Sequence, residues 1–242
     1  MRIDIVTLFP DMFSATMDES ILARARKKGH FQLCCHQLRD YSPDRNGKVD
    51  DTVFGGGKGM LLSPEPIARC FDAIDEHLSC RSYRIFMSPR GKVMTQKKIV
   101  QLSVLPNIVV LCGHYEGVDQ RVLDQYIDEE ISIGDYVLTG GEIPAMILVD
   151  SLSRMLSGVL SDSSCFENES HFEGALEYPQ YTRPERWRGL KVPPVLLSGH
   201  HENIRRWKRQ EALQITHDRR PDLFNKLNLS KEDKLLLTKK DK

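Results

Sequence analysis

The chain has 242 residues, and its 34 basic and 34 acidic side chains give a formal net charge of zero. Hydrophobic residues at 40% and charged residues at 28% are typical of a globular protein and exclude a disordered tail, a collagen-like fibre and a disulfide scaffold. The zero conceals a split. Residues 1–182 carry 18 basic and 26 acidic side chains, a net of −8, whereas residues 183–242 carry 16 basic and 8 acidic, a net of +8. This asymmetry favours a polyanionic partner.

The first two thirds of the chain alternate short apolar segments with segments of helical periodicity. We expect strands at Ile3–Leu8, Phe31–Leu38, Tyr83–Met87, Asn107–Cys112 and Tyr126–Ile133. We expect helices at Pro64–Leu78, Thr95–Val104, Val118–Gln125 and Glu142–Leu156. The alternation predicts an α/β fold with a mostly parallel sheet and crossover helices. On the last helix, a stripe with helical spacing predicts the buried face: Ile147, Leu148, Ser151, Leu152 and Met155.

The composition changes after this helix. Residues 157–177 are rich in Ser, Glu and Gly without a sustained period, which predicts a mobile linker of the kind that often serves as a functional lid. Helices are then expected at Ser198–Thr216, Asp222–Leu229 and Ser230–Lys242. The chain therefore divides into an α/β domain over 1–160, a linker over 161–180 and a small, basic, all-α domain over 181–242.

Nothing in the sequence indicates secretion or a membrane. The apolar segment Met1–Pro10 is interrupted by Arg2 and Asp4 and precedes no cleavage site, so it predicts a buried strand. No apolar run approaches the roughly 18 residues needed to cross a bilayer. The six cysteines form neither a CxxC pair nor a zinc-ligand spacing, which favours reduced thiols in a cytoplasmic protein.

Three glycine- or proline-rich turns directly follow expected strands. They are Ser88–Gly91, Gly113–Gly117 and the segment from Ile133 to Gly141. Ligands of open α/β sheets bind outside the carboxyl ends of the strands. One such turn alone would be a tight turn and no more, but three at one edge predict a pocket built from backbone N–H and C=O groups.

The densest glycine cluster lies elsewhere, at Gly55–Gly59. It fails the phosphate-binding pattern because no Ser or Thr follows Lys58, and it also fails the dinucleotide pattern. Its spacing favours a flexible surface loop. A loop whose bare backbone approaches a ligand or a partner subunit is the alternative.

Several charged side chains are candidates for chemistry. His114 and Glu116 lack the further ligands of a metal cluster, so a hydrogen-bonding role is favoured. Arg154 directly precedes the linker, and its ordinary role would be a solvated surface cation. The linker carries carboxylates that either solubilise the segment or include a general base: Glu167, Glu169, Glu173 and Glu177.

Aromatic and arginine side chains are interleaved where the basic region begins. Tyr181 and Arg183 are followed closely by Trp187 and Arg188. This pattern suits stacking on unpaired bases together with phosphate contacts.

Long motifs now make a resemblance evident along essentially the whole chain. They are Met1–Pro10, Gly55–Met60, Met87–Gly91, Leu111–Asp119, Ser132–Glu142, Tyr181–Pro184 and Ser198–His201. With these motifs the chain resembles the bacterial tRNA (guanine37-N1)-methyltransferases of the knotted SPOUT class. The resemblance implies a deep trefoil knot in the α/β domain, and a homodimer whose active sites lie at the subunit interface, near the Gly55–Met60 loop.

The resemblance also implies that S-adenosylmethionine binds in the knot. Carried over by position, the cofactor-binding residues are Ser88, Pro89, Gly113, Glu116, Ile133, Gly134, Asp135, Tyr136, Val137, Leu138, Gly140, Gly141 and Pro144. Magnesium dependence is a further family property, but no local ligand cluster identifies a metal site in the sequence.

Two catalytic roles carry over by position. The family's linker aspartate, which removes the N1 proton of guanine, becomes Glu169, one methylene longer. The arginine that stabilises the negative charge on O6 becomes Arg154. Glu167 or Glu173 is the alternative base if the linker register is shifted.

The resulting hypothesis is a cytoplasmic tRNA methyltransferase with neither a membrane nor DNA as partner. One alternative is a knotted methyltransferase that acts on another RNA, such as ribosomal RNA. A second alternative, from another class, is a non-catalytic RNA-binding module or chaperone that retains the pocket. The linker carboxylates and the basic C-terminal domain over 181–242 favour the first hypothesis.

Overall fold

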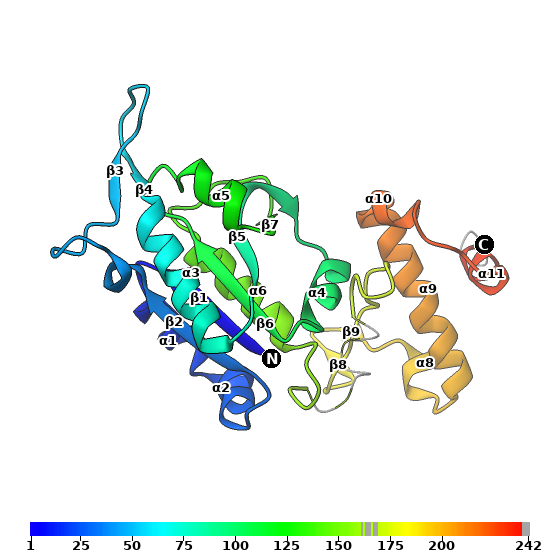
Figure 1. Cartoon of the computed structure of the whole chain (residues 1–242). Helices are drawn as coiled ribbons and strands as arrows, with labels where there is room; N and C mark the ends of the chain where they lie inside the picture. Colours follow the sequence, from blue (N-terminus) through cyan, green and yellow to red (C-terminus); the bar gives the residue numbers. More distant parts are fainter. Residues whose placement is uncertain (161, 163–165, 167–168, 239–242) are drawn as a thin grey trace. The chain divides into compact units, whose positions relative to one another are not determined.

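The computed structural model describes residues 1–160, 162, 166 and 169–238 (Figure 1). The chain forms two compact units, Met1–Ser161 and Asp162–Lys242. The first is an α/β unit with a parallel sheet, and the second is mainly helical. The predicted fold class is therefore confirmed, whereas the predicted functions of the segments stay predictions.

The first unit is built on a five-stranded sheet with the order β2-β1-β6-β5-β7. Every neighbouring pair is parallel. The strands are β1 (Arg2–Thr7), β2 (Gln32–Gln37), β5 (Tyr83–Val93), β6 (Asn107–Cys112) and β7 (Glu129–Ser132). Their apolar character follows from burial on both faces, as expected for a parallel sheet covered by helices.

Helices cover both faces of this sheet (Figure 1). Side chains alternate along β1, so Ile3 and Ile5 join one core cluster and Val6 joins the other. The first cluster includes residues of α1 (Asp11–Met17), α2 (Ser20–Lys27), α4 (Gln96–Ser103) and α6 (Glu142–Ser153). The second includes residues of α3 (Pro64–Leu78), α5 (Gln120–Tyr126) and the 3₁₀ helix η1 (Leu38–Tyr41).

A short hairpin carries the glycine cluster. It consists of β3 (Asp50–Thr52) and β4 (Met60–Leu62), which pair antiparallel. Strand β4 of this hairpin is hydrogen-bonded to the loop after β6. Leu62 N donates to Gly117 O at 3.0 Å, and Glu116 N donates to Met60 O at 3.0 Å. The expected surface position is confirmed, because Gly55, Gly56 and Gly57 are exposed and an added Cβ would meet nothing within 4 Å. Only Gly59 lies close to another segment, since a Cβ there would lie 2.5 Å from the Glu116 carboxylate.

The second unit has a small core. Its elements are β8 (Arg186–Trp187), β9 (Leu190–Lys191), α8 (Pro194–Leu197), α9 (His201–Arg219), α10 (Pro221–Phe224) and α11 (Lys231–Thr238). The shorter helices α10 and α11 pack against α9. Among the described residues, those of α9 that are fully buried are Ala212, Leu213 and Thr216. Helix α10 is shorter than the expected Asp222–Leu229.

Two expectations about α6 are corrected. The helix ends at Ser153, so Arg154 is its C-cap residue. Its buried face is Ala145, Leu148, Val149 and Leu152, whereas Ile147 of the expected stripe is 39% exposed. The helix is apolar around most of its circumference, so the spacing of its apolar residues alone could not predict which face is buried.

The trefoil knot stays a prediction. The structure does show the segment before α6 running tightly against the end of β6. Gly141 N donates to Gly113 O at 2.8 Å, and a Cβ on Gly141 would lie 2.7 Å from Cys112 Cα. Only glycine fits at that crossing.

Candidate cofactor site

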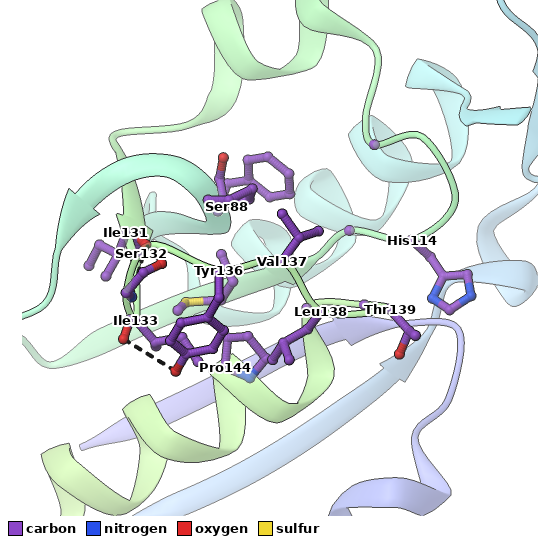
Figure 2. Close-up of a pocket in the computed structure, with 18 of the residues that line it drawn as sticks. Ser88, His114, Ile131, Ser132, Ile133, Tyr136, Val137, Leu138, Thr139 and Pro144 are labelled. Carbon is purple, nitrogen blue, oxygen red and sulfur yellow. Dashed lines mark hydrogen bonds between the residues drawn. The ribbon is translucent and has the colours of Figure 1, made fainter. Parts of the chain in front are cut away.

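The three turns singled out in the sequence meet at one edge of the sheet. Strands β6, β5 and β7 are adjacent and parallel, so their carboxyl ends lie together. A pocket of about 190 Å³ lies there (Figure 2). Its lining residues are Phe86, Met87, Ser88, Pro89, Gly113, His114, Tyr115, Glu116, Gly117, Ile131, Ser132, Ile133, Gly134, Tyr136, Val137, Leu138, Thr139, Gly140, Gly141 and Pro144.

The first turn interrupts strand β5. Met87 and Lys92 both pair with Ile131, so the residues between them leave the ladder. Ser88 is buried there, and its Oγ accepts a hydrogen bond from Arg90 N at 3.2 Å. A Cβ on Gly91 would lie 2.5 Å from the Glu130 backbone. The missing side chain lets the chain turn tightly beside β7.

The second turn, Gly113–Gly117, needs unusual backbone angles. Tyr115 and Gly117 have φ of 57° and 121°. A Cβ on Gly113 would lie 2.9 Å from the Phe86 ring. The His114 ring packs against Tyr115 and Phe9, with centroids 4.9 and 5.0 Å away. Within the described part of the chain its buried Nδ1 has no hydrogen-bond partner.

The third turn is ordered by its own backbone. Gly134 N donates to Ser132 Oγ at 3.1 Å, and Tyr136 N donates to Gly134 O at 2.9 Å. Figure 2 shows Ser88 on one side of the pocket and Tyr136, Leu138 and Pro144 on the opposite side. The exposed apolar side chains of this turn provide a surface for a flat, partly apolar ligand.

A buried acid lies behind the pocket. Glu142, the first residue of α6, is 3% exposed and accepts a hydrogen bond from Thr7 Oγ1 at 2.8 Å. The helix N-terminus also favours its negative charge. Burial and the Glu142 carboxylate raise the pKa of the Cys112 thiol well above its ordinary value, and Cys35 adds to the shift. Cys112 is therefore a neutral thiol at physiological pH.

The structure brings the expected cofactor-binding residues together with one exception. Asp135 is exposed and does not line the pocket, because the turn directs it to solvent. Sequence reasoning missed the strand ends Phe86, Met87 and Ile131, whose apolar character looks like ordinary core. The residues carried over by position also omit Ser132 and Thr139, which lie within the quoted motif Ser132–Glu142 and line the pocket. Cofactor binding by these residues stays a prediction.

The expected catalytic pair is divided between the two units. Arg154 caps α6 in the first unit. Glu169 lies in the second unit and lines a cavity of about 440 Å³ together with Glu173 and the basic residues Arg205, Lys208 and Arg209. The alternative base Glu167 lies outside the described residues. The joint action of Arg154 and Glu169 therefore stays a prediction.

The described residues contain neither a metal-ligand cluster nor a membrane-spanning helix. Among these residues, no group of three or more His, Cys, Asp or Glu side chains could hold a metal ion, and the expected magnesium dependence stays a prediction. No described helix is long and apolar enough to cross a membrane.

The fold and pocket define a class: an α/β protein with a pocket lined by glycine-rich turns at the carboxyl edge of its sheet, followed by a mainly helical unit. The model of the family tRNA (Guanine-1)-methyltransferase TrmD matches residues 1–226. The chain belongs to this family. A tRNA (guanine-N(1)-)-methyltransferase of Ruminiclostridium cellulolyticum is 53% identical over 94% of this chain and 97% of the relative.

Further relatives agree. The enzyme of the same name from Clostridium acetobutylicum is 50% identical over 98% of this chain and 96% of its own. The crystal structure of the tRNA (m1G37) methyltransferase from Aquifex aeolicus superposes with a TM-score of 0.76 at 40% identity, covering 93% of this chain and 95% of that one. The expected family and enzyme class are confirmed, and action on another RNA is not favoured.

Proposed function

We propose that the protein transfers the methyl group of S-adenosylmethionine to N1 of guanine 37, on the 3′ side of the tRNA anticodon. The observation that carries the proposal is the pocket at the carboxyl edge of β5, β6 and β7 in a chain of this family. The three turns that the sequence analysis grouped together line one pocket, and it lies where α/β sheets bind ligands.

The pocket suits the proposed cofactor. Backbone groups of the glycine-rich turns can bond the polar edges of an adenine and a ribose, and Tyr136, Leu138 and Pro144 present apolar surface to their faces. A Cβ on Gly113 or on Gly141 would lie within 3.0 Å of neighbouring atoms, so any larger side chain there would displace the turns. S-adenosylmethionine supplies an electrophilic methyl group on a sulfonium.

The residues of the chain must then make guanine N1 nucleophilic. N1 carries a proton at neutral pH, and its removal moves negative charge onto O6. We assign proton removal to the Glu169 carboxylate, because a positioned base contributes about 10²–10⁴-fold to such a step. We assign stabilisation of the O6 charge to the Arg154 guanidinium. Alignment of N1 with the methyl group supplies much of the remaining acceleration.

Residues 183–242, with their net charge of +8, are the proposed contact for the tRNA phosphates. The acidic remainder of the chain is suited to the small cofactor instead. The described cysteines are free thiols, which agrees with action in the cytoplasm. Magnesium dependence is proposed from the family alone, and no step is assigned to the ion.

Substitution of the carboxylates tests the chemistry. Glu169→Gln should lower single-turnover methyl transfer by at least about 100-fold while the dissociation constant for S-adenosylmethionine stays unchanged. Glu173→Gln, from the same cavity, is the matched variant and identifies the base if the register is shifted. Mass spectrometry of the RNA product fixes the methylated base and atom. Near-normal turnover in Glu169→Gln would contradict the assignment of the base to Glu169.

We further propose a homodimer in which Arg154 of one subunit acts with Glu169 of the partner subunit. Mixing inactive Arg154→Ala and Glu169→Gln proteins tests this arrangement. Random subunit exchange gives half heterodimers, each with one intact site, and therefore about a quarter of wild-type activity. No recovery after verified exchange would show that both residues act within one subunit.

A further inference from the structure

The small hairpin β8–β9 presents an aromatic ring to solvent in a fixed geometry. Trp187 pairs with Leu190 across the two strands, and Val192 N donates to Glu185 O at 3.0 Å. The intervening turn residues Arg188 and Gly189 have φ of 49° and 87°, the positive values that a two-residue hairpin turn requires. The hairpin is therefore a defined structural element.

Its apolar side chains are more exposed than folding requires. Trp187 is 57% exposed and its cross-strand partner Leu190 is 69% exposed. The Arg188 guanidinium lies over the Trp187 ring, 4.9 Å from its centroid. Because more than half of Trp187 stays exposed, the ring retains an accessible surface for another planar group.

The hairpin also concentrates unneutralised positive charge. Residues 183–191 include one acid, Glu185, and four exposed cations: Arg183, Arg186, Arg188 and Lys191. Within the part of the chain that the structure describes, these four cations have no ion-pair partner.

The arginines of α9 differ. Arg205 and Arg206 pair with Glu202 and Glu232, and Arg209 pairs with Asp233 at 2.8 Å. Much of the charge along α9 is therefore balanced internally. The four cations of residues 183–191, which outnumber the single acid there, are therefore available for a polyanion.

We propose that the hairpin binds an unpaired nucleotide of the tRNA substrate, with the base stacked on Trp187 and the flanking phosphates held by the surrounding cations. An exposed indole next to arginine matches the stacking and charge that single-stranded nucleic acid requires, whereas bases within a duplex are not accessible for stacking. This inference rests on the proposed function, because it deepens the recognition of the same substrate.

The affinity for unmodified tRNA tests the stacking. Trp187→Ala should weaken binding about tenfold and leave its salt dependence unchanged, whereas Trp187→Phe should retain most of the affinity. Arg188→Gln should instead reduce the slope of log affinity against log salt by about one. Leu235→Ala, which shortens another exposed apolar side chain of this unit, is the matched control and should bind normally.

Fluorescence gives a direct readout of contact. The chain has two tryptophans, so in Trp207→Phe the remaining emission comes from Trp187. Addition of tRNA or of a single-stranded RNA oligonucleotide should quench it, and the same oligonucleotide in a duplex should not. Normal tRNA affinity in Trp187→Ala, with no quenching, would overturn the hairpin assignment and leave the proposed methyl transfer intact.

Two further outcomes separate the proposals. If the wild type does not methylate tRNA but Trp187→Ala still weakens RNA binding, the proposed function fails and the hairpin contact stands. If Trp187→Ala changes the sedimentation of the protein without RNA, the hairpin is an interface between copies of the chain, and the RNA assignment is overturned.

Discussion

The two units of this chain are stabilised by different means. The first unit encloses its sheet between two clusters of aliphatic and aromatic side chains, many with no exposed surface. The second unit buries few apolar side chains, and acid–arginine pairs link α9 to the segment around α11. We infer that packing fixes the pocket of the first unit, whereas the stability of the second unit depends on charge and so on pH and salt.

The largest expected effect is in the core of the first unit. Ile99→Ala removes a 2% exposed side chain from α4 and should lower the free energy of unfolding by about 2–5 kcal/mol, from lost burial and the remaining cavity. Urea denaturation measures it. Val100→Ala, one residue further and 40% exposed, is the matched control. Similar losses in both variants would contradict the role of core packing in stabilising the first unit.

The next effect concerns the crossing behind the pocket. In Gly141→Ala the new Cβ would lie 2.7 Å from Cys112 Cα and 2.8 Å from Gly113 N, backbone atoms that cannot rotate away. We expect a loss of about 1–3 kcal/mol in stability together with weakened cofactor binding in calorimetry. Gly57→Ala, whose Cβ would meet no atom within 4 Å, should leave stability nearly unchanged.

A smaller effect is expected for the ion pair between Arg209 and Asp233 in the second unit. The hydrogen bonds from Arg209 hold the pKa of Asp233 at about 2, and Ser230 contributes through the cap of α11. A lowered folded-state pKa adds stability above the ordinary aspartate pKa, and this stability is lost as pH falls from about 4 to about 2. Asp233→Asn should cost about 1–2 kcal/mol at pH 7 and flatten that acid transition. If the stability of Asp233→Asn fell over this pH range as steeply as that of the wild type, the pair would not be the source of the acid transition.

The smallest effect is expected for an exposed pair on the same helix. Glu202→Gln removes a partner of Arg205 and Arg206, but all three side chains are more than half exposed. Solvent screens such pairs, so the thermal midpoint should not change measurably. If Glu202→Gln lowered the thermal midpoint as much as Asp233→Asn does, surface charge in general would stabilise the unit, and the pair between Arg209 and Asp233 would have no special role.

Much of the fold could be predicted from the sequence because its elements are bounded by strong local signals. The five expected strands match the five strands of the sheet, and Pro64–Leu78 is helical over the expected residues. Strand order depends on contacts between distant segments and could not be predicted from these signals. The hairpins β3–β4 and β8–β9 were missed because strands of two or three residues are too short for alternation to register.

The candidate site shows the same limit. Its turns were predicted from glycine and proline positions, since these residues mark turns regardless of tertiary context. Phe86, Met87 and Ile131 were not predicted, because a strand residue that lines a pocket has the same composition as one that fills the core. The proximity of Gly59 to Glu116 required the pairing of β4 with the loop after β6, which is a non-local contact.

The neutral state of Cys112 has a protective consequence. A sulfonium methyl donor is an alkylating agent, and thiolates are the strongest nucleophiles among ordinary side chains. Cys112 directly precedes Gly113 of the pocket wall, yet its burial and the neighbouring Glu142 carboxylate keep it protonated. Under the proposed function, a reactive methyl group held in this pocket would therefore meet a neutral thiol and not a thiolate at Cys112.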